Sequence, residues 1–341
     1  GSNCRVVGIA DGFGVAEDPA GLDTQELLRL VNESLPITEF DRSKLSSTGV
    51  SLSVTTDEGL ARRNSMHFRV KADAFLPAGG RPNTINNDNW QNFLDKEGQP
   101  SSKLIVEGAN IFITPEARFN LFDKARVAIV KDSSANKCGV ITSSCEVAAS
   151  MLLSKAEFMA NKAEIVEDVL VQLRKLARLE GELLFKEYNN YPGALPSFSE
   201  RISQAIATVT DAVTDALESV PPEDPLFQEL MPLIYDSLPK KLVQVGGDRI
   251  PTNFPVQYQR NAIASALASK LVYKEGIHLV ETQPRQVLAE RAFQYYRKDV
   301  QIQALLRGLR GEQAHEVAEK NKDFIINVLE KGGARAGLDI F

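Results

Sequence analysis

The stretch Lys103-Leu104-Ile105-Val106-Glu107-Gly108-Ala109-Asn110 decides the fold of the first half of the chain. It begins as a short apolar run, which indicates a buried strand, and it ends in the small and polar residues that commonly follow strands. Thr114-Pro115-Glu116-Ala117 comes next and is typical of a helix start, with threonine as N-cap and proline at the first helical position. A strand followed by a helix favours parallel crossovers, and hence an α/β sheet.

Three further apolar runs extend this pattern. They cover residues 5–10, closed by Asp11-Gly12, residues 72–76, ended by Pro77-Ala78-Gly79-Gly80, and residues 126–130, followed by a polar stretch up to Val140. Residues 24–32 have a helical apolar face. Because an open α/β sheet binds ligands at the carboxyl ends of its strands, we expect a ligand site at these strand ends.

Helical patterns replace the strands from about residue 146. They cover 146–188, 202–220, 256–274, 284–308 and 312–331. One side of the first pattern consists of Ile165, Val169, Leu173, Leu176, Leu179 and Leu183. The sequence therefore predicts an α/β domain over 1–145 and an α-helical domain over 146–341.

Composition excludes several classes of protein. The chain has 39 basic and 45 acidic residues and a net charge of −6, which argues against a non-specific nucleic-acid binder. No run of 18 apolar residues occurs, so a membrane span is not expected. Three cysteines and three widely separated histidines predict neither a disulfide framework nor a metal site, and they fit a reducing, intracellular compartment.

Asp11 is the first candidate site residue. An acidic side chain at a strand end can bind the ribose hydroxyls of a dinucleotide, yet Asp-Gly is also a common turn dipeptide, and spacing alone favours the turn. The Gly-x-Gly-x-x-Gly fingerprint that would precede such a residue is absent.

The other strand ends carry small residues together with amide or hydroxyl groups. Glycines in 77–80 let the main chain approach a ligand, and Asn110 and Asn136 can both donate and accept hydrogen bonds. An ordinary turn is the favoured explanation of each strand end taken alone, but the three strand ends together are more informative than any one. Cys138 and Cys145 have no histidine nearby in the sequence, so we interpret both as buried small residues rather than nucleophiles.

These motifs, in their order, resemble the glutamate dehydrogenases, and in detail the large-subunit NAD-specific type found in fungi and other organisms. The resemblance covers residues 4–147, and it is carried by Ile9-Ala10-Asp11-Gly12-Phe13-Gly14, Asp18-Pro19-Ala20-Gly21-Leu22-Asp23, residues 72–83, Val106-Glu107-Gly108-Ala109-Asn110, residues 114–117 and residues 131–143. It implies an incomplete Rossmann-like doubly wound sheet that lacks its first strand and glycine-rich loop. The helical half is similar to the C-terminal extension of the large type, which implies an all-α domain.

The resemblance also implies ligands, namely NAD, L-glutamate, 2-oxoglutarate and ammonia. The implied cofactor contacts are those of Asp11 with the adenosine ribose, of Pro77, Ala78 and Gly79 with the cofactor groove, and of Glu107, Gly108 and Asn110 with the nicotinamide ribose. Asn136 would face the nicotinamide and the α-carbon end of the substrate, and Ser143 would contact the side-chain carboxylate of the substrate. Lys137 and Cys138 depart from the small glutamate dehydrogenases, which have alanine and glycine there.

The family's catalytic lysine and aspartate belong to an N-terminal domain that no segment here matches. We therefore expect a C-terminal fragment, inactive alone, of a homo-oligomeric enzyme of the cytoplasm or the mitochondrion. Two alternatives stay open: a dehydrogenase for another amino acid, and a helical interaction or oligomerisation module with a degenerate nucleotide site. A missing central strand would leave two unpaired strand edges, so we expect the flanking strands to pair directly, or another segment or chain to fill the gap.

Asp11 generates a prediction about cofactor choice. We predict that the whole protein prefers NAD to NADP, because a carboxylate at the adenosine ribose disfavours an added phosphate. Asp11→Ser should weaken this discrimination. Steady-state rates with each cofactor measure it, and equal efficiency with both, or a preference for NADP, would contradict the prediction.

Overall fold

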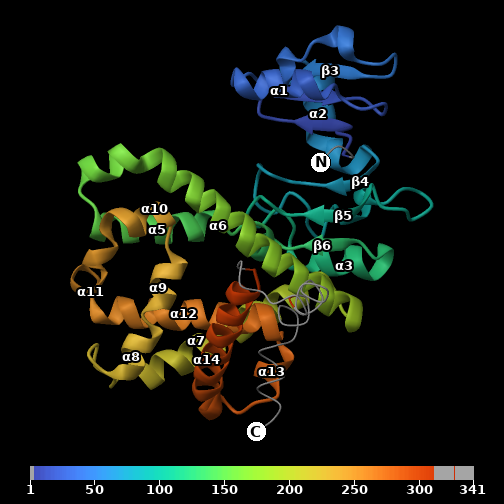
Figure 1. Cartoon of the computed structure of the whole chain (residues 1–341). Coiled ribbons are helices and arrows are strands. Elements are labelled where there is room, and N and C mark those ends of the chain that lie inside the picture. Colours follow the sequence, from blue (N-terminus) through green and yellow to red (C-terminus); the bar gives the residue numbers. More distant parts are fainter. Residues whose placement is uncertain (1–3, 311–325, 327–341) are drawn as a thin grey trace. The chain divides into compact units, whose positions relative to one another are not determined.

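The computed structural model describes residues 4–310 and residue 326 of the chain. The chain forms two compact units (Figure 1): the first holds the residues up to Asn136 together with Ala194–Pro196, and the second holds Lys137–Gly193 and the residues from Ser197 onward. Within the described residues, no helix combines the length and the apolar character that crossing a membrane requires. The second unit begins earlier than residue 146, because helix α5 (Cys138–Leu152) belongs to it.

An antiparallel sheet of three strands opens the first unit. Its strands are β1 (Gly8–Ala10), β2 (Gly14–Glu17) and β3 (Val50–Ser53), in the order β1-β2-β3. β1 and β2 form a hairpin, and β2 pairs antiparallel with β3. The expectation that residues 5–10 supply a strand of the parallel sheet is therefore wrong. The strand is present, but it pairs with the segment of chain that follows it.

Asp11 explains why the chain reverses after β1. Its Oδ1 atom accepts hydrogen bonds from the N–H groups of Phe13 and Gly14 at 2.8 and 3.0 Å, and its Oδ2 atom accepts from the N–H of Ile37 at 2.7 Å. Gly14 has no room for a side chain, since a Cβ would lie 2.3 Å from the Leu52 carbonyl oxygen. These contacts are those of a turn residue, as the Asp-Gly dipeptide indicates.

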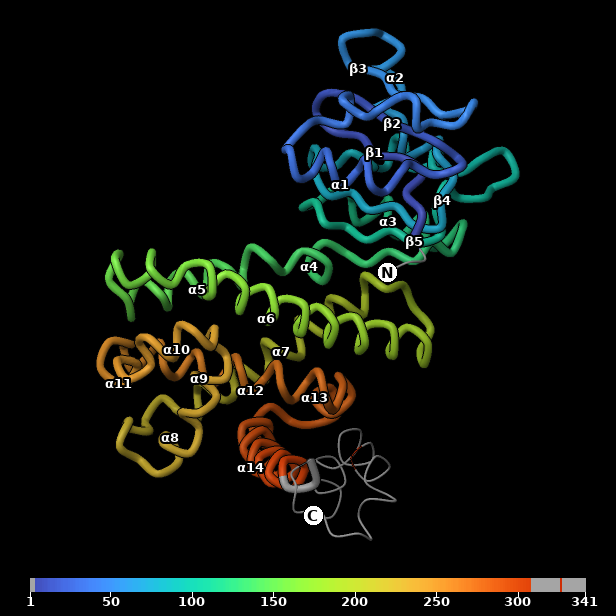
Figure 2. Tube along the Cα trace, turned by 45° about the horizontal axis from the view of Figure 1, so that its top comes forward, coloured from blue at the N-terminus to red at the C-terminus, as the bar shows by residue number. Residues whose placement is uncertain are grey.

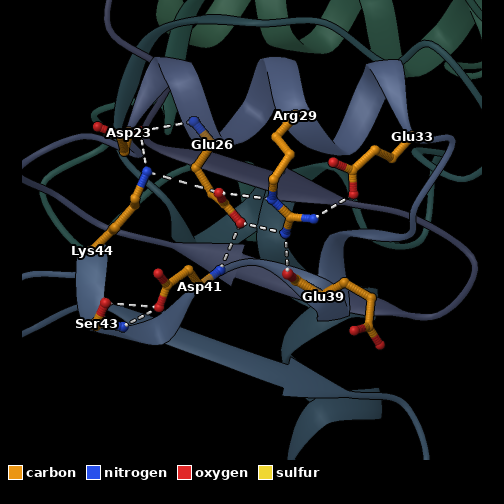
Figure 3. Close-up of polar contacts among 8 residues, drawn as sticks. All are labelled: Asp23, Glu26, Arg29, Glu33, Glu39, Asp41, Ser43 and Lys44. Atoms are coloured by element: carbon orange, nitrogen blue, oxygen red, sulfur yellow. Dashed lines mark hydrogen bonds and ion pairs between the residues drawn. The ribbon is translucent and has the colours of Figure 1, made fainter.

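Helix α1 (Thr24–Asn32) is held against residues 39–44 by a network of polar contacts (Figure 3). The carboxylate of Glu26 accepts from Arg29 Nη2 and Nε at 2.6 and 3.0 Å and from the N–H of Asp41 at 3.0 Å. Arg29 also donates to the Glu39 carbonyl oxygen at 3.0 Å. The hydrogen bonds from Arg29 lower the pKa of Glu26 to about 2, so the network stays charged at neutral pH.

A parallel sheet of three strands follows in the first unit. Its strands are β4 (Ala72–Phe75), β5 (Ser102–Val106) and β6 (Ala128–Val130), in that order. Helix α3 (Pro115–Ala125) connects β5 to β6, and its N-cap Thr114 accepts from the N–H of Ala117 at 3.3 Å. The predicted parallel arrangement of strands and helix is confirmed for residues 72–130.

The core of this part consists of large apolar side chains from the sheet, α3 and the loops between them. Its buried members are Ile85, Phe93, Ile105, Phe112, Ile113, Ala117, Leu121, Val127 and Ile129. Trp90, the single tryptophan of the chain, packs against this cluster, so its fluorescence reports on the first unit.

The two sheets of the first unit remain separate. Within the described residues, β1 is hydrogen-bonded to β2 alone and β4 to β5 alone. The expectation that the flanking strands pair directly is therefore wrong, because β1 pairs within its own hairpin. That another segment or chain lies between β1 and β4 stays a prediction. Helix α2 (Asp57–Arg69) contacts both β2 and the short 3-10 helix η3 (Trp90–Phe93) beside the parallel sheet.

The described part of the second unit is built from helices. The prediction of one helix over 146–188 is wrong. The segment forms two helices, because α5 ends at Leu152 and α6 (Lys155–Asn190) begins after a short interruption. Ser154 forms a capping box there: its Oγ accepts from the N–H of Glu157 at 3.3 Å, and its own N–H donates to Glu157 Oε2 at 2.7 Å. The sequence signal was serine followed three residues later by glutamate.

The predicted helices over 202–220, 256–274 and 284–308 are confirmed with shifted ends, and the one over 312–331 lies outside the described residues apart from residue 326. Figure 2 traces the helices of the second unit in chain order. The remaining helices within residues 4–310 are α4 (Asp132–Ala135), α7 (Leu195–Leu217), α8 (Pro225–Leu230), α9 (Pro232–Ser237), α10 (Lys240–Gly246), α11 (Ile250–Asn253), α12 (Val256–Glu275), α13 (His278–Glu281) and α14 (Arg285–Arg310), with the 3-10 helices η1 (Ile37–Glu39), η2 (Arg42–Lys44) and η4 (Gly247–Arg249).

His67, on α2, packs into an aromatic cluster of the first unit. The centroid of its ring lies 4.0 Å from that of Phe68, 5.9 Å from that of Phe75 and 6.0 Å from that of Phe112. Its Nε2 atom is buried and has no hydrogen-bond partner among the described residues. Burial lowers the pKa of His67 from 6.5 to about 4, so the imidazole is neutral at a pH where the unfolded chain is already protonated.

We predict that the first unit loses stability as the pH falls from 6.5 to 4, because only the unfolded chain binds the His67 proton over that range. The loss from this residue amounts to about 3 kcal/mol, at about 1.4 kcal/mol for each pKa unit. His67→Phe keeps an aromatic ring and removes the titration, so its free energy of unfolding should depend less on pH. Urea unfolding followed by Trp90 fluorescence measures this.

His278→Phe, at an exposed histidine of the second unit, is the control and should leave the pH dependence unchanged. The same pH dependence in the wild type and in His67→Phe would rule out this role for His67.

Candidate functional site

The carboxyl ends of the three parallel strands form the candidate site. β4, β5 and β6 are parallel neighbours, so their last residues, Phe75, Val106 and Val130, lie at one edge of the sheet. The loops that leave this edge cover residues 76–80, 107–111 and 131–136. Open α/β sheets bind ligands outside this edge.

The first two of these loops are tied together through their main chains. The N–H of Ala109 donates to the Pro77 carbonyl oxygen at 2.7 Å. Gly108 lies close as well, since a Cβ there would stand 3.4 Å from the Pro77 oxygen and 3.6 Å from the Ala78 Cα atom. Ala78 and Gly79 are exposed, and a Cβ at Gly79 would meet no atom within 4 Å. Their main chain is therefore accessible to a ligand.

Two asparagines join the second loop to the third. Asn136 Nδ2 donates to Asn110 Oδ1 at 2.9 Å, with Asn110 exposed and Asn136 half-buried. Asn136 follows α4, and Asn110 lies four residues beyond the end of β5. The structure thus brings together the two amide side chains that the sequence singled out on separate strand ends.

Asp132 fixes the backbone of the second loop. Its Oδ2 atom accepts from the N–H of Ile111 at 2.8 Å, while the Ile111 carbonyl oxygen accepts from the N–H of Asn83 at 2.7 Å. Ile111 has a φ of 52°, in the left-handed region, which is costly for a β-branched residue. The hydrogen bonds on both sides of Ile111 hold it in this conformation.

Glu107 is buried beneath the loop that it begins. Its carboxylate is 0% exposed and accepts from Arg118 Nε at 2.8 Å, from Arg118 Nη2 at 3.2 Å and from the N–H of Ile113 at 3.0 Å. Arg118 Nη2 also lies 3.5 Å from Asp132 Oδ1. Burial raises the pKa of Glu107, and the hydrogen bonds from Arg118 oppose that shift. In this arrangement the Glu107 side chain cannot contact a ligand. The contact expected between Glu107 and the nicotinamide ribose could therefore be made only by the main chain of Glu107.

Sequence reasoning missed Arg118. The residue lies on α3 three positions before Leu121, so both occupy the same side of the helix, and Leu121 is in the core. An arginine on the apolar side of a helix needs a buried counter-charge, because guanidinium groups are rarely buried alone. An arginine on the apolar side of the predicted helix was therefore the sequence signal for the ion pair between Arg118 and Glu107.

Asp11 and Ser143 lie apart from these loops in the sequence and in secondary structure. Asp11 occupies the β1–β2 turn, where both of its carboxylate oxygens are hydrogen-bonded. Ser143 is exposed on α5 in the second unit, and its contact with a substrate stays a prediction.

The interpretation of two buried cysteines is confirmed for Cys145, whose thiol pKa is raised by burial, but it is wrong for Cys138, which is exposed.

The edge offers neutral hydrogen-bonding groups to a ligand. Pro77 is buried and its carbonyl oxygen is used by Ala109, but the main chain of Ala78 and Gly79 and the amides of Asn110 and Asn136 suit hydroxyl and carboxamide groups, since each amide both donates and accepts. The carboxylates of Glu107 and Asp132 are already engaged with protein groups. In the described part of the chain, no three His, Cys, Asp or Glu side chains gather closely enough to hold a metal ion.

This parallel sheet, with helix α3 crossing over between β5 and β6, defines an α/β domain. Residues 1–190 match the Glutamate/Leucine/Phenylalanine/Valine dehydrogenase family. The chain belongs to this family.

Curated relatives match most of the chain. It is 35% identical over 306 residues to the probable NAD-specific glutamate dehydrogenase of Schizosaccharomyces pombe, and 33% identical over 302 residues to glutamate dehydrogenase 2 of Dictyostelium discoideum. It is also 33% identical over 299 residues to the NAD-specific glutamate dehydrogenase of Saccharomyces cerevisiae. These matches take in 83%, 81% and 79% of this chain, which spans only 27%, 28% and 27% of the three relatives.

The buried ion pair generates a stability prediction. Arg118→Met should destabilise the first unit by about 3–5 kcal/mol, because it leaves the Glu107 carboxylate buried without its counter-charge. Urea unfolding followed by Trp90 fluorescence measures the change. Arg42→Met is the matched control at an exposed arginine of the same unit and should stay within about 0.5 kcal/mol of the wild type. Equal losses in the two variants would contradict the role given to the pair.

Proposed function

We propose that this chain is the cofactor-binding part of an NAD-dependent glutamate dehydrogenase. The whole protein would oxidise L-glutamate to 2-oxoglutarate and ammonia. The observation that carries the proposal is the pairing of Asn110 and Asn136 at 2.9 Å on the carboxyl edge of the parallel sheet, in a chain of this dehydrogenase family. The names of its relatives favour NAD and glutamate over other cofactors and substrates.

The chemistry of this edge fits the nicotinamide end of a dinucleotide. Ribose hydroxyls and a carboxamide are neutral groups, which neutral amides and main-chain groups bind without a buried charge. In the proposal the main chain of Ala78 and Gly79 lines the cofactor groove, and Gly108 and Asn110 lie by the nicotinamide ribose. Asn136 faces the nicotinamide and the α-carbon of the substrate. When bound, NAD supplies the chemistry of hydride acceptance.

Asp11 would bind the adenosine ribose in the same proposal. Its carboxylate already accepts three N–H groups in the hairpin turn. An ionised carboxylate offers about four acceptor positions, so one remains for a ribose hydroxyl. Because Asp11→Ser also removes turn contacts, thermal unfolding of this variant has to accompany the comparison of NAD with NADP.

Proton transfer during deamination would come from outside this edge. It needs a lysine and a carboxylate in a water-excluded cleft, and Glu107 and Asp132 are already engaged in holding the loops. We therefore assign acid–base catalysis to another part of the whole protein, with Ser143 as a contact for the substrate carboxylate. Loss of such groups typically costs about 10²–10⁴-fold in rate.

Two other functions remain as alternatives. The family description includes dehydrogenases for leucine, phenylalanine and valine, so a different amino acid is one of them. The other is a helical interaction module with a degenerate nucleotide site. Rates of the whole protein with the four amino acids separate the first from glutamate oxidation, and NAD titration of the chain separates the second.

We predict that the purified chain binds NAD but produces no NADH with saturating glutamate. Asn136→Ala should weaken NAD binding about three- to tenfold, because a net hydrogen bond contributes about 0.5–1.5 kcal/mol. Isothermal titration calorimetry measures the affinity, and Asn92→Ala, at an exposed asparagine of η3, is the control.

Robust turnover by the chain alone would refute the assignment of catalysis to another part of the protein. Unchanged affinity in Asn136→Ala would instead refute the site.

A further inference from the structure

Arg63 differs from the other arginines of α2 in its electrostatic partners. Arg62 contacts the carboxylates of Glu58 and Glu17 at 3.2 and 3.4 Å, and Arg69 is also paired with Glu17. Within residues 4–310, by contrast, the contacts of the Arg63 guanidinium are to neutral oxygens and not to a carboxylate. The positive charge of Arg63 is therefore not matched by an ion pair there.

Two neutral oxygens hold the Arg63 side chain at the turn between β1 and β2. Its Nε atom donates to the Asp11 carbonyl oxygen at 2.9 Å, and its Nη1 atom donates to Asn64 Oδ1 at 2.9 Å. A guanidinium carries five N–H donors, so these two bonds leave the majority of them unused by the part of the chain that the structure describes. Arg63 is half-buried, so its position is fixed while part of the side chain stays open to solvent.

The residue that anchors Arg63 is the one proposed to bind the adenosine ribose. The main chain of Asp11 accepts from Arg63, while its carboxylate accepts from three N–H groups and keeps one acceptor position. Gly12 is exposed, and a Cβ there would meet no atom within 4 Å, so a ligand can reach the turn from solvent. A carboxylate and an unpaired guanidinium are therefore both available at one turn.

These two groups favour different cofactors. NADP differs from NAD by a phosphate in place of the 2′-hydroxyl of the adenosine ribose. A carboxylate accepts a hydrogen bond from the hydroxyl but repels the phosphate, whereas an arginine accommodates the phosphate. Guanidinium groups bind phosphate strongly, because their paired donors match its oxygens and carry a positive charge.

We propose that Arg63 is a second determinant of cofactor choice, a binding group for the 2′-phosphate of NADP whose effect the Asp11 carboxylate opposes. The inference rests on the proposed function, because it requires the adenosine ribose at Asp11. Arg63 is bonded to the carbonyl oxygen of residue 11 and not to its carboxylate. Replacement of the Asp11 side chain therefore leaves the anchor of Arg63 in place and removes the opposing charge.

The other two arginines of α2 are not suited to this role. Both are paired with Glu17, which is 6% exposed and lies opposite Gly8 in the β1–β2 ladder, at the end away from the turn. Turning either arginine toward a ligand would weaken the pairing of a buried carboxylate, which is costly. Arg62 is thus a matched control for Arg63, because it has the same charge on the same helix.

Calorimetric titration of the purified chain with NAD and with NADP tests the proposal. The readout is the ratio of the two dissociation constants, because a general disturbance of the turn changes both affinities alike. We expect Asp11→Ser to shift this ratio toward NADP about tenfold or more, as a hydrogen bond to a charged group does. Asp11→Ser/Arg63→Met should lose the shift, and Asp11→Ser/Arg62→Met should keep it. Thermal unfolding confirms that each variant is folded.

The possible failures of the inference and of the proposed function are distinct. If NAD still binds but Asp11→Ser does not shift the ratio, or if Asp11→Ser/Arg63→Met keeps the shift, the role of Arg63 is refuted and the proposed function stands. An equal loss of the shift in the Arg62 control also refutes a specific role for Arg63. A wild-type chain that binds neither cofactor refutes the proposed function, and the inference about Arg63 with it.

Discussion

The buried ion pair between Glu107 and Arg118 is the interaction on which the strand-end site depends. Arg118 belongs to α3, Glu107 directly follows β5, and Asp132, which Arg118 also approaches, lies two residues after the end of β6. A guanidinium keeps its charge in a protein, so it requires carboxylates around it once it is buried. The helix is thereby tied to two strand ends at once. The loops are positioned from beneath, and their outer surfaces remain available to a ligand.

The division between charged and neutral groups gives this edge its chemical character. Its carboxylates hold the loops, while main-chain groups and the amides of Asn110 and Asn136 are among the groups left accessible. An edge of this kind suits the binding and orientation of a neutral cofactor surface better than proton transfer. The chain itself spans about a quarter of the length of the relatives it matches.

In the helical unit, capping residues determine where helices begin, and the apolar sides of the helices determine how they pack. A capping box of Ser154 and Glu157 begins α6 shortly after α5 ends at Leu152, although the apolar helical pattern of the sequence continues across the break. The same pattern leaves apolar side chains of α6 exposed, such as those of Met159 and Val166. Apolar periodicity therefore indicates which side of a helix favours burial. It does not indicate whether that side is covered by the same unit or by another molecule.

The sequence by itself determined the local structure. The apolar runs, the Thr114-Pro115 helix start and the turn at Asp11-Gly12 each depend on a few neighbouring residues, and each was predictable for that reason. It also singled out Asn110 and Asn136, because parallel strands bring their carboxyl ends together. Only the tertiary structure decided that β1 pairs with β2 instead of entering the parallel sheet, and that Glu107 is enclosed by Arg118. Strand partners and buried ion pairs depend on which elements pack against one another, and a strand presents the same apolar run whichever partner completes its hydrogen bonds.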